Sequence, residues 1–336
     1  MNRRNYPSIT RLLVFSLLLM ISCPCFGQES SSKIDKIDLH DFIEMLSSSE
    51  FEGRGIDNDG QIKTQEFIIN RFEELQLEPF SPDGYLERFS LCYNLYGRLQ
   101  LKTVTKADCG YCGVTDEFEL SGKIIETANV IGVIRGESEK AIVISAHYDH
   151  IGQDESHYYP GADDNASGVA ALLELAEEFS HYENLKYTLI FLATSAEEGG
   201  LLGSLYHTEQ PDFDPAKIVC NVNLDMIARC DIHHPDCNYL YCMGNDNSEM
   251  LDSIVRKAEA MFPHCTFDYS DNGSGVFERT DAYNFMKKGV PSILFFAGFH
   301  DDYHQPTDTM DKIDFDILEN RIKLISEVIK LIQQIN

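Results

Sequence analysis

Histidine and acidic residues gather directly after an apolar run in the middle of the chain. Residues 141–145 form this run, and His147 and Asp149 follow it at once. Asp164 comes shortly afterwards, in the glycine-flanked stretch 161–168. An apolar run of this length is typical of a buried strand, and open α/β sheets bind their ligands at strand ends. Imidazole and carboxylate groups at such an edge suit a transition metal, and one aspartate can bridge two ions.

Three further apolar runs are followed by the same residue types. The residues are Glu197 and Glu198 after 187–193, Asp225 after 218–224, and His304 after 292–297. Two histidines and at least three carboxylates on successive loops predict a dinuclear site, in which the ions lie about 3.5–4 Å apart. Neutral imidazole together with carboxylate favours zinc, although cobalt or manganese binds similar ligands.

The two adjacent glutamates indicate the class of reaction. Neighbouring side chains on a tight turn point in different directions, so either Glu197 or Glu198 can bind metal while the other faces an attacking water. A carboxylate in that place can take the proton of the water and pass it to a leaving nitrogen. Metal ions lower the pKa of the water and polarise the carbonyl group under attack. The pattern therefore predicts metal-assisted hydrolysis.

The elements that must position these residues alternate between strands and helices. Strands are predicted over 85–105, 127–135, 141–146, 187–193, 218–226, 239–243, 265–269 and 292–297. Helices are predicted over 38–46, 61–77, 167–179, 201–206, 248–261, 281–287 and 314–335. Such alternation is typical of a sheet between helical layers. We expect an α/β fold with three αβα layers, in which a mixed, mostly parallel sheet of about eight strands has helices on both faces.

The N-terminus predicts export. Three arginines precede the short apolar run 12–21, and small or polar residues follow it. This pattern is typical of a secretory signal, and the run is too short to cross a bilayer. Residues 1–27 are therefore predicted to be a signal peptide, or a lipoprotein signal that ends before a lipidated Cys23. Residues 28–336 are predicted to form a single catalytic domain that is periplasmic or secreted, either free or anchored through that lipid.

The charge and the cysteine content narrow the choice of partners. The formal net charge is −28, from 27 basic and 55 acidic residues, which argues against binding to nucleic acid or to an anionic membrane. No later stretch is apolar for long enough to form a transmembrane span. The ten cysteines include Cys23 and Cys25, and the other eight are compatible with disulfides of undefined pairing. Cys109 and Cys112 have thioredoxin-like spacing without a surrounding βαβ pattern, so a local link or free thiols are expected.

Taken together, these motifs resemble those of the di-zinc aminopeptidases of the bacterial leucyl aminopeptidase type. This is a zinc-dependent exopeptidase family with a phosphorylase/hydrolase-like fold. The similarity runs from about Leu46 to the C-terminus and includes Glu-Gly-Arg-Gly over 52–55 and Thr-Ala-Asn-Val-Ile over 127–131. The resemblance implies two zinc ions and peptide substrates with a free N-terminus.

The resemblance also implies a role for each site residue. One zinc would be bound by His147 and Asp225, the other by Glu198 and His304, with Asp164 as the bridge. Glu197 would be the general base. Asp149 would orient the imidazole of His147. Tyr303 would donate a hydrogen bond to the developing oxyanion.

Other polar residues close to these motifs are not expected to bind metal. His150 and Asp163 are predicted to be neighbours of the site, and His300 is treated in the same way. Residues 230–242 and 268–280 follow core strands and are expected to form walls of the substrate pocket.

The chain departs from the family pattern in two places. Residues 280–282 read Thr-Asp-Ala, where the family often has Ser-Asp-His or Ser-Asp-Tyr, so the substrate pocket is expected to differ there. Between Tyr85 and Thr127 there are too few residues for the protease-associated domain that many relatives carry.

Two other functions remain open. Glutaminyl cyclases resemble this chain, but they hold a single zinc and generally lack the first histidine ligand. A non-catalytic binding protein on the same scaffold would be expected to have lost ligands or the base. The presence of His147, Glu197 and Glu198 favours the peptidase.

Overall fold

The computed structural model describes residues 36–93, 98–102, 124–210, 213–234, 236–270 and 275–335. Residues 34–336 cluster into one unit by their contacts. The predicted signal with Cys23, and the pair Cys109 and Cys112, lie outside the described residues. Within the described ranges, no helix combines the length and the apolar character that crossing a bilayer requires.

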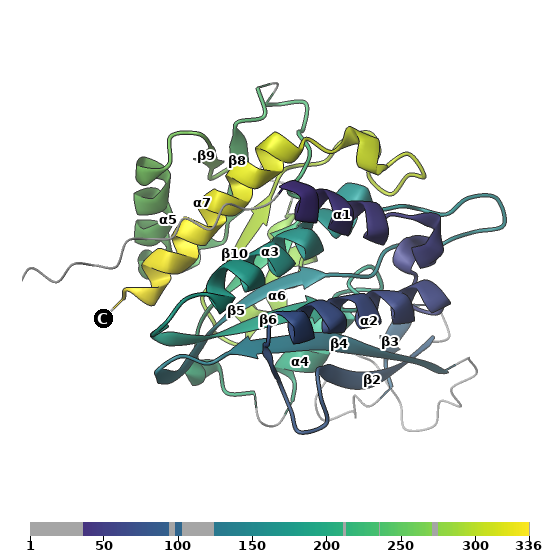
Figure 1. The fold of residues 1–336 in the computed structure, drawn as a ribbon, viewed down its shortest axis with the longest axis horizontal. Helices are drawn as coiled ribbons and strands as arrows, with labels where there is room; N and C mark the ends of the chain where they lie inside the picture. Colours follow the sequence, from purple (N-terminus) through teal and green to yellow (C-terminus); the bar gives the residue numbers. More distant parts are fainter. Residues whose placement is uncertain are drawn as a thin grey trace, which may run out of the picture. The chain divides into compact units, whose positions relative to one another are not determined.

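A mixed sheet of ten strands forms the centre of the fold, in the order β3-β2-β4-β6-β5-β7-β10-β8-β9 with β1 paired to β4 (Figure 1). The strands are β1 (Glu78–Pro79), β2 (Leu86–Tyr93), β3 (Leu99–Leu101), β4 (Ile124–Ile134), β5 (Ser138–His147), β6 (Tyr187–Thr194), β7 (Ile218–Asp225), β8 (Tyr239–Met243), β9 (Thr266–Asp268) and β10 (Ser292–Phe296). The central strands β6, β5, β7 and β10 run parallel, and antiparallel pairs join this block on both sides. The predicted α/β class is confirmed. Ten strands replace the expected eight or so because the segment predicted over 85–105 forms both β2 and β3, and the two-residue strand β1 is added.

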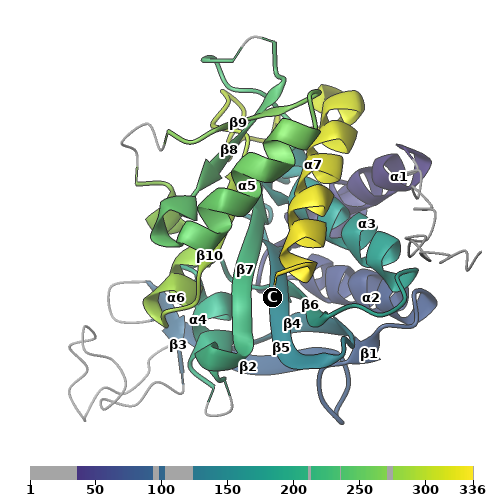
Figure 2. The same cartoon turned by 90° about the vertical axis from the view of Figure 1, so that its left-hand side faces the viewer.

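Helices cover both faces of the sheet. They are α1 (Lys36–Leu46), α2 (Asp59–Glu74), α3 (Gly168–Ser180), α4 (Leu202–Thr208), α5 (Glu249–Met261), α6 (Ala282–Lys287) and α7 (Phe315–Gln333). On one face, α3 packs on β5, β6 and β7 and also contacts α1, α2 and α7. On the other face, α4 and α6 contact each other and the sheet, as Figure 2 shows. The predicted three layers are therefore present.

Strand β5 explains why the apolar run before His147 is unbroken. Ile142 and Ile144 are buried in the core that includes residues of α3, whereas Val143 is buried in a separate core with Phe285 of α6. Successive side chains of a strand point to opposite faces, so a strand covered on both sides needs apolar residues at every position. β5, which ends at His147, therefore lies between the two helical layers.

Local capping sets the starts of the helices. The side chain of Asn58 accepts a hydrogen bond from the backbone N–H of Gln61 at the start of α2. Asp314 accepts one from the N–H of Ile317 at the start of α7. These contacts satisfy backbone donors that have no partner within a helix.

Candidate metal centre

The parallel register of the central strands brings the predicted site residues to one edge of the sheet. β5 ends at His147, which lies beside Thr194 at the end of β6. β7 ends at Asp225, which lies beside Phe296 at the end of β10. The two glutamates follow β6, and the loop with His304 follows β10. Four loops therefore meet at the carboxyl ends of these strands.

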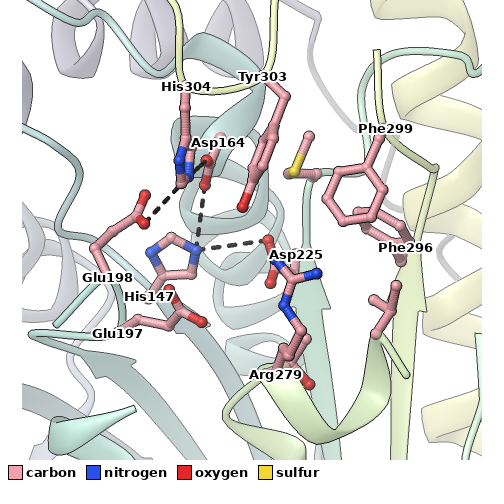
Figure 3. Close-up of a pocket in the computed structure, with 13 residues that line it drawn as sticks. His147, Asp164, Glu197, Glu198, Asp225, Arg279, Phe296, Phe299, Tyr303 and His304 are labelled. Atoms are coloured by element: carbon pink, nitrogen blue, oxygen red, sulfur yellow. Dashed lines mark ion pairs between the residues drawn. The ribbon is translucent and has the colours of Figure 1, made fainter. Parts of the chain in front are cut away.

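Asp164 stands at the middle of the cluster, in the segment Ala162–Ser167 that precedes α3, where its own backbone is not helical. Its Oδ1 lies 3.4 Å from Nε2 of His147, and the same nitrogen lies 3.5 Å from Oδ1 of Asp225. Oδ2 of Asp164 lies 3.1 Å from Nε2 of His304, and this nitrogen is also 3.1 Å from Oε2 of Glu198 (Figure 3). Each oxygen of Asp164 therefore faces a different pair of ligand candidates.

His150 lies closer to this centre than the sequence suggested. Its Nδ1 lies 3.0 Å from Oε1 of Glu198 and 3.6 Å from Oδ2 of Asp164. The ligand atoms of His150, Asp164 and Glu198 are near enough to one another to hold an ion, as are those of His147, Asp164 and Asp225. His150 is therefore in direct contact with the second group, beside His304.

The electrostatic properties of the cluster favour the binding of cations. Burial alone would lower the pKa of His147, but the carboxylates around it, first among them Glu197, raise that pKa well above its usual value. Burial likewise opposes protonation of His304, whereas hydrogen bonds to Asp164 and Glu198 raise its pKa to about 10. Oδ2 of Asp164 is buried beside two imidazole nitrogens, Nε2 of His304 at 3.1 Å and Nδ1 of His150 at 3.6 Å. Imidazole nitrogens and carboxylate oxygens in this number fit zinc.

Glu197 and Tyr303 line the pocket beside the metal-ligand candidates. The pKa of Glu197 is raised well above the usual value, chiefly by burial and further by nearby carboxylates such as Glu198, while His147 opposes the shift. A raised pKa suits a carboxylate that takes up and releases a proton. The ring of Tyr303 stacks on that of His304 with 3.8 Å between the centroids. Its hydroxyl is turned toward the pocket (Figure 3).

Asp149 contacts both the imidazole of His147 and the turn that carries the two glutamates. Its carboxylate lies 3.9 Å from Nδ1 of His147, and it is the backbone oxygen of Asp149 that lies 3.1 Å from that nitrogen. The carboxylate also accepts hydrogen bonds from the backbone N–H groups of Glu197 and Glu198, at 3.1 and 3.3 Å. It therefore lies against both the imidazole of His147 and the glutamate turn. Burial is the main cause that raises the pKa of Asp149 to about 7.

Two buried residues outside the ligand set hold Asp164 in place. Oδ2 of Asp308 accepts hydrogen bonds from the N–H groups of Asp163 and Asp164, at 3.0 and 3.1 Å. Arg54 donates five hydrogen bonds, all to backbone oxygens: Tyr148 at 3.0 Å, Leu46 at 2.6 Å, Pro160 at 2.7 Å, Gly161 at 2.8 Å and Asp164 at 3.3 Å. Burial lowers the pKa of this arginine to about 10 against the opposing effect of nearby carboxylates. Arg54 thus connects the loop after β5 to the loop that carries Asp164.

Sequence reasoning missed the role of Arg54 and did not single out Arg279. Arg54 was noted only as part of the Glu-Gly-Arg-Gly motif over 52–55, although the glycines on both sides of it indicate a close backbone contact. A Cβ atom on Gly53 would lie 2.1 Å from the backbone oxygen of Gly152. Arg279 belongs to the expected wall segment 268–280, which contributes Val276, Arg279 and Thr280 to the pocket.

One disulfide lies close to the site in sequence. Cys230 and Cys237 are bonded across the loop that follows β7. Four other described cysteines are buried free thiols: Cys92, Cys220, Cys242 and Cys265.

Comparison with solved structures supports the fold. The chain superposes on LapB from Legionella pneumophila with a TM-score of 0.66 and 19% identity, over 90% of this chain and 73% of that one. A zinc aminopeptidase from Bacillus subtilis superposes with a TM-score of 0.65 and 17% identity, over 89% of this chain and 95% of that one. A glutaminyl cyclase from Porphyromonas gingivalis superposes with a TM-score of 0.65 and 18% identity, over 88% of this chain and 98% of that one. At these identities the likeness shows a shared fold.

Comparison with curated sequences indicates the family. A probable lipoprotein aminopeptidase, LpqL of Mycobacterium tuberculosis, is 28% identical over 232 residues, which are 60% of this chain and 44% of that protein. A probable leucine aminopeptidase of Arthroderma otae is 30% identical over 198 residues, and the match covers 55% of this chain and 52% of that protein. The chain thus spans about half the length of these relatives. Residues 129–329, more than half of the chain, match Peptidase family M28, and the chain therefore belongs to this family.

Proposed function

We propose that the chain is an exported metallo-aminopeptidase that removes N-terminal residues from peptides at a dinuclear zinc site. The observation that carries the proposal is the position of Asp164, whose two oxygens face two separate pairs of ligand candidates. We assign His147 and Asp225 to one zinc, Glu198 and His304 to the other, and Asp164 to both. Membership of Peptidase family M28 and the similarity to aminopeptidases of the leucyl type support this assignment.

The residues around the metals would divide the chemistry among them. Zinc supplies Lewis acidity, which favours deprotonation of the attacking water and polarises a peptide carbonyl. Glu197, which lines the pocket beside the metal-ligand candidates, would accept the proton of that water and deliver it to the leaving nitrogen. The hydroxyl of Tyr303 would donate a hydrogen bond to the carbonyl oxygen as negative charge develops on it. Asp149 would hold the backbone of the glutamate turn.

The test combines metal analysis with turnover of aminoacyl-nitroanilides. We expect about two zinc ions per chain, loss of turnover with retained zinc in Glu197→Ala, and loss of zinc in Asp164→Ala. Glu66→Ala, an exposed glutamate on α2, is the matched control and should behave as wild type. Equal activity of Glu197→Ala and wild type would disprove the assignment of the base.

A glutaminyl cyclase is the second candidate, because a cyclase shares the fold. The contact of His147 with both Asp164 and Asp225 favours two metal positions over one. One tightly bound zinc per chain, with cyclisation of N-terminal glutamine and no peptidase activity, would establish the cyclase instead.

We also propose that residues 1–27 direct export and that Cys23 is the site of lipidation if the chain is anchored. The similarity to a probable lipoprotein aminopeptidase supports this idea. Fractionation of expressing cells with a lipid label tests it. Label on wild type that is absent from Cys23→Ala would establish the anchor, and unlabelled protein in the periplasm or medium would favour a cleaved signal.

A further inference from the structure

The proposed active site contains one positive side chain that is not part of the metal cluster. Arg279 lines the pocket, as do the apolar residues Val276 and Phe296, and Figure 3 shows it on the side away from His304 and Glu198. Figure 3 shows its guanidinium group turned inward, between this apolar wall and Asp225. Arg279 is therefore placed where a bound substrate would meet it.

The guanidinium of Arg279 is held in place without being neutralised. It lies over the ring of Phe299, 5.8 Å from the centroid, and it forms no ion pair with a carboxylate among the described residues. Arg71, Arg135, Arg229 and Arg256, by contrast, each pair with an acidic side chain. Stacking on an aromatic ring orients a guanidinium and leaves its N–H donors available to another group.

The charge of Arg279 identifies the ligand that it can bind. The free N-terminus of a peptide is a cation, so a guanidinium repels it. A carboxylate is the complementary group, because it accepts two parallel hydrogen bonds from the guanidinium fork. The other charged side chains that line the pocket are carboxylates, which would repel such an anion, and histidines that belong to the metal-ligand candidates.

We propose that Arg279 binds a carboxylate of the substrate and gives the site a preference for substrates that carry one next to the cleaved bond. The inference rests on the proposed peptidase function and adds a substrate class to it. The carboxylate has two sources, the side chain of an N-terminal Glu or Asp and the terminal carboxylate of a dipeptide. In the first case, the methylene groups of the side chain would pack against Val276 and Phe296. Because Arg279 is itself exposed, we expect kcat/KM for a substrate with this carboxylate to exceed that for a matched substrate without it by about tenfold.

Two pairs of peptides separate the sources. Glu-Ala-Ala-amide and Gln-Ala-Ala-amide differ only in the charge of the first side chain, and Ala-Ala and Ala-Ala-amide differ only in the terminal carboxylate. For the zinc-loaded full chain, we expect kcat/KM to favour the carboxylate member of at least one pair by about tenfold. The first pair identifies a side-chain carboxylate, and the second identifies a terminal one.

Variants link the preference to Arg279. Arg279→Gln should bring the ratio within the favoured pair close to one, and Arg279→Lys, which keeps the charge, should retain part of it. Arg256→Gln, which removes an exposed arginine of α5, should leave the ratio as in wild type. A ratio near one in both pairs for wild type, or an unchanged ratio in Arg279→Gln, would overturn the inference.

A binding measurement keeps this result separate from the proposed function. Complete lack of hydrolysis of all four peptides would refute the peptidase and leave Arg279 to be judged by calorimetry with L-glutamate and L-glutamine. About tenfold tighter binding of glutamate, lost in Arg279→Gln, would support the carboxylate site. Equal binding of the two amino acids that is weakened in Arg279→Gln would identify the terminal carboxylate as the ligand, and equal binding that is unchanged in this variant would overturn the inference.

Discussion

The carboxylate of Asp149 accepts a hydrogen bond from the backbone N–H of Glu197 at 3.1 Å, although 48 residues separate the two. The second oxygen of the same carboxylate accepts the N–H of Glu198 at 3.3 Å. A residue two positions past the end of β5 thus holds the turn that follows β6. The direction of the Glu197 side chain depends on this contact, because the side chain projects from the turn.

Replacing Asp149 with Asn tests this contact. An asparagine side chain has one carbonyl oxygen, so one of the two N–H groups would face an NH2 group instead of an acceptor. We expect kcat to fall by about 10- to 100-fold while the zinc content stays near that of wild type. Steady-state kinetics and metal analysis of the same preparations measure both quantities. Asp154→Asn, in an exposed loop, is the control, and equal kcat values for wild type and Asp149→Asn would contradict the expectation.

Arg54→Met should destabilise the fold strongly. The substitution leaves the backbone oxygens of Tyr148, Pro160 and Gly161 buried without their donor, and each such group costs about 1–3 kcal/mol. We therefore expect the free energy of unfolding in urea to fall by about 3 kcal/mol or more. Arg135→Met, at an exposed arginine paired with Glu78, should change it by less than about 1 kcal/mol. A similar small change in both variants would show that Arg54 is dispensable.

Asp231 should make stability depend on pH in the acidic range. Burial opposes its ionisation, but hydrogen bonds from Tyr241, His234 and the N–H of His233 outweigh burial and lower its pKa. A lowered folded-state pKa adds stability above the unfolded value of about 3.9, and this stability is lost as pH falls through the folded value. Asp231→Asn should therefore unfold at a lower temperature than wild type at pH 7, and the difference should shrink below about pH 4.

Thermal unfolding between pH 7 and pH 3 measures this effect. Asp246→Asn, on the surface, serves as the control, and its difference from wild type should stay flat across the range. A gap between wild type and Asp231→Asn that widens toward low pH would reverse the predicted sign.

The disulfide between Cys230 and Cys237 should add modest stability, because it closes a short loop. Loop-closure entropy for this length corresponds to about 2–3 kcal/mol. We expect the double variant Cys230→Ser and Cys237→Ser to lose about this much in urea unfolding. A reducing agent should destabilise wild type by about this much more than it destabilises the double variant. Insensitivity of wild type to the reductant would rule out a stabilising role.

The strand-end residues were accessible to prediction because short-range patterns place them. The apolar runs before His147 and Asp225 mark strands that are buried on both faces, and parallel strands must end at the same edge. Ten strands form instead of about eight because short edge strands carry too few residues for a clear pattern. The start of α2 is local in the same way, since Asn58 caps a helix three residues away.

The sequence alone thus determined the α/β class, the family resemblance and the strand ends at which the candidate ligands lie. Only the tertiary structure decided that Asp149 binds the glutamate turn, that Arg54 connects two loops and that Arg279 faces the pocket. The physical reason is that these contacts join segments far apart in the chain, through side chains on loops whose directions no periodic pattern sets. The loop paths depend on packing and on long-range hydrogen bonds, which exist only once the whole sheet has formed.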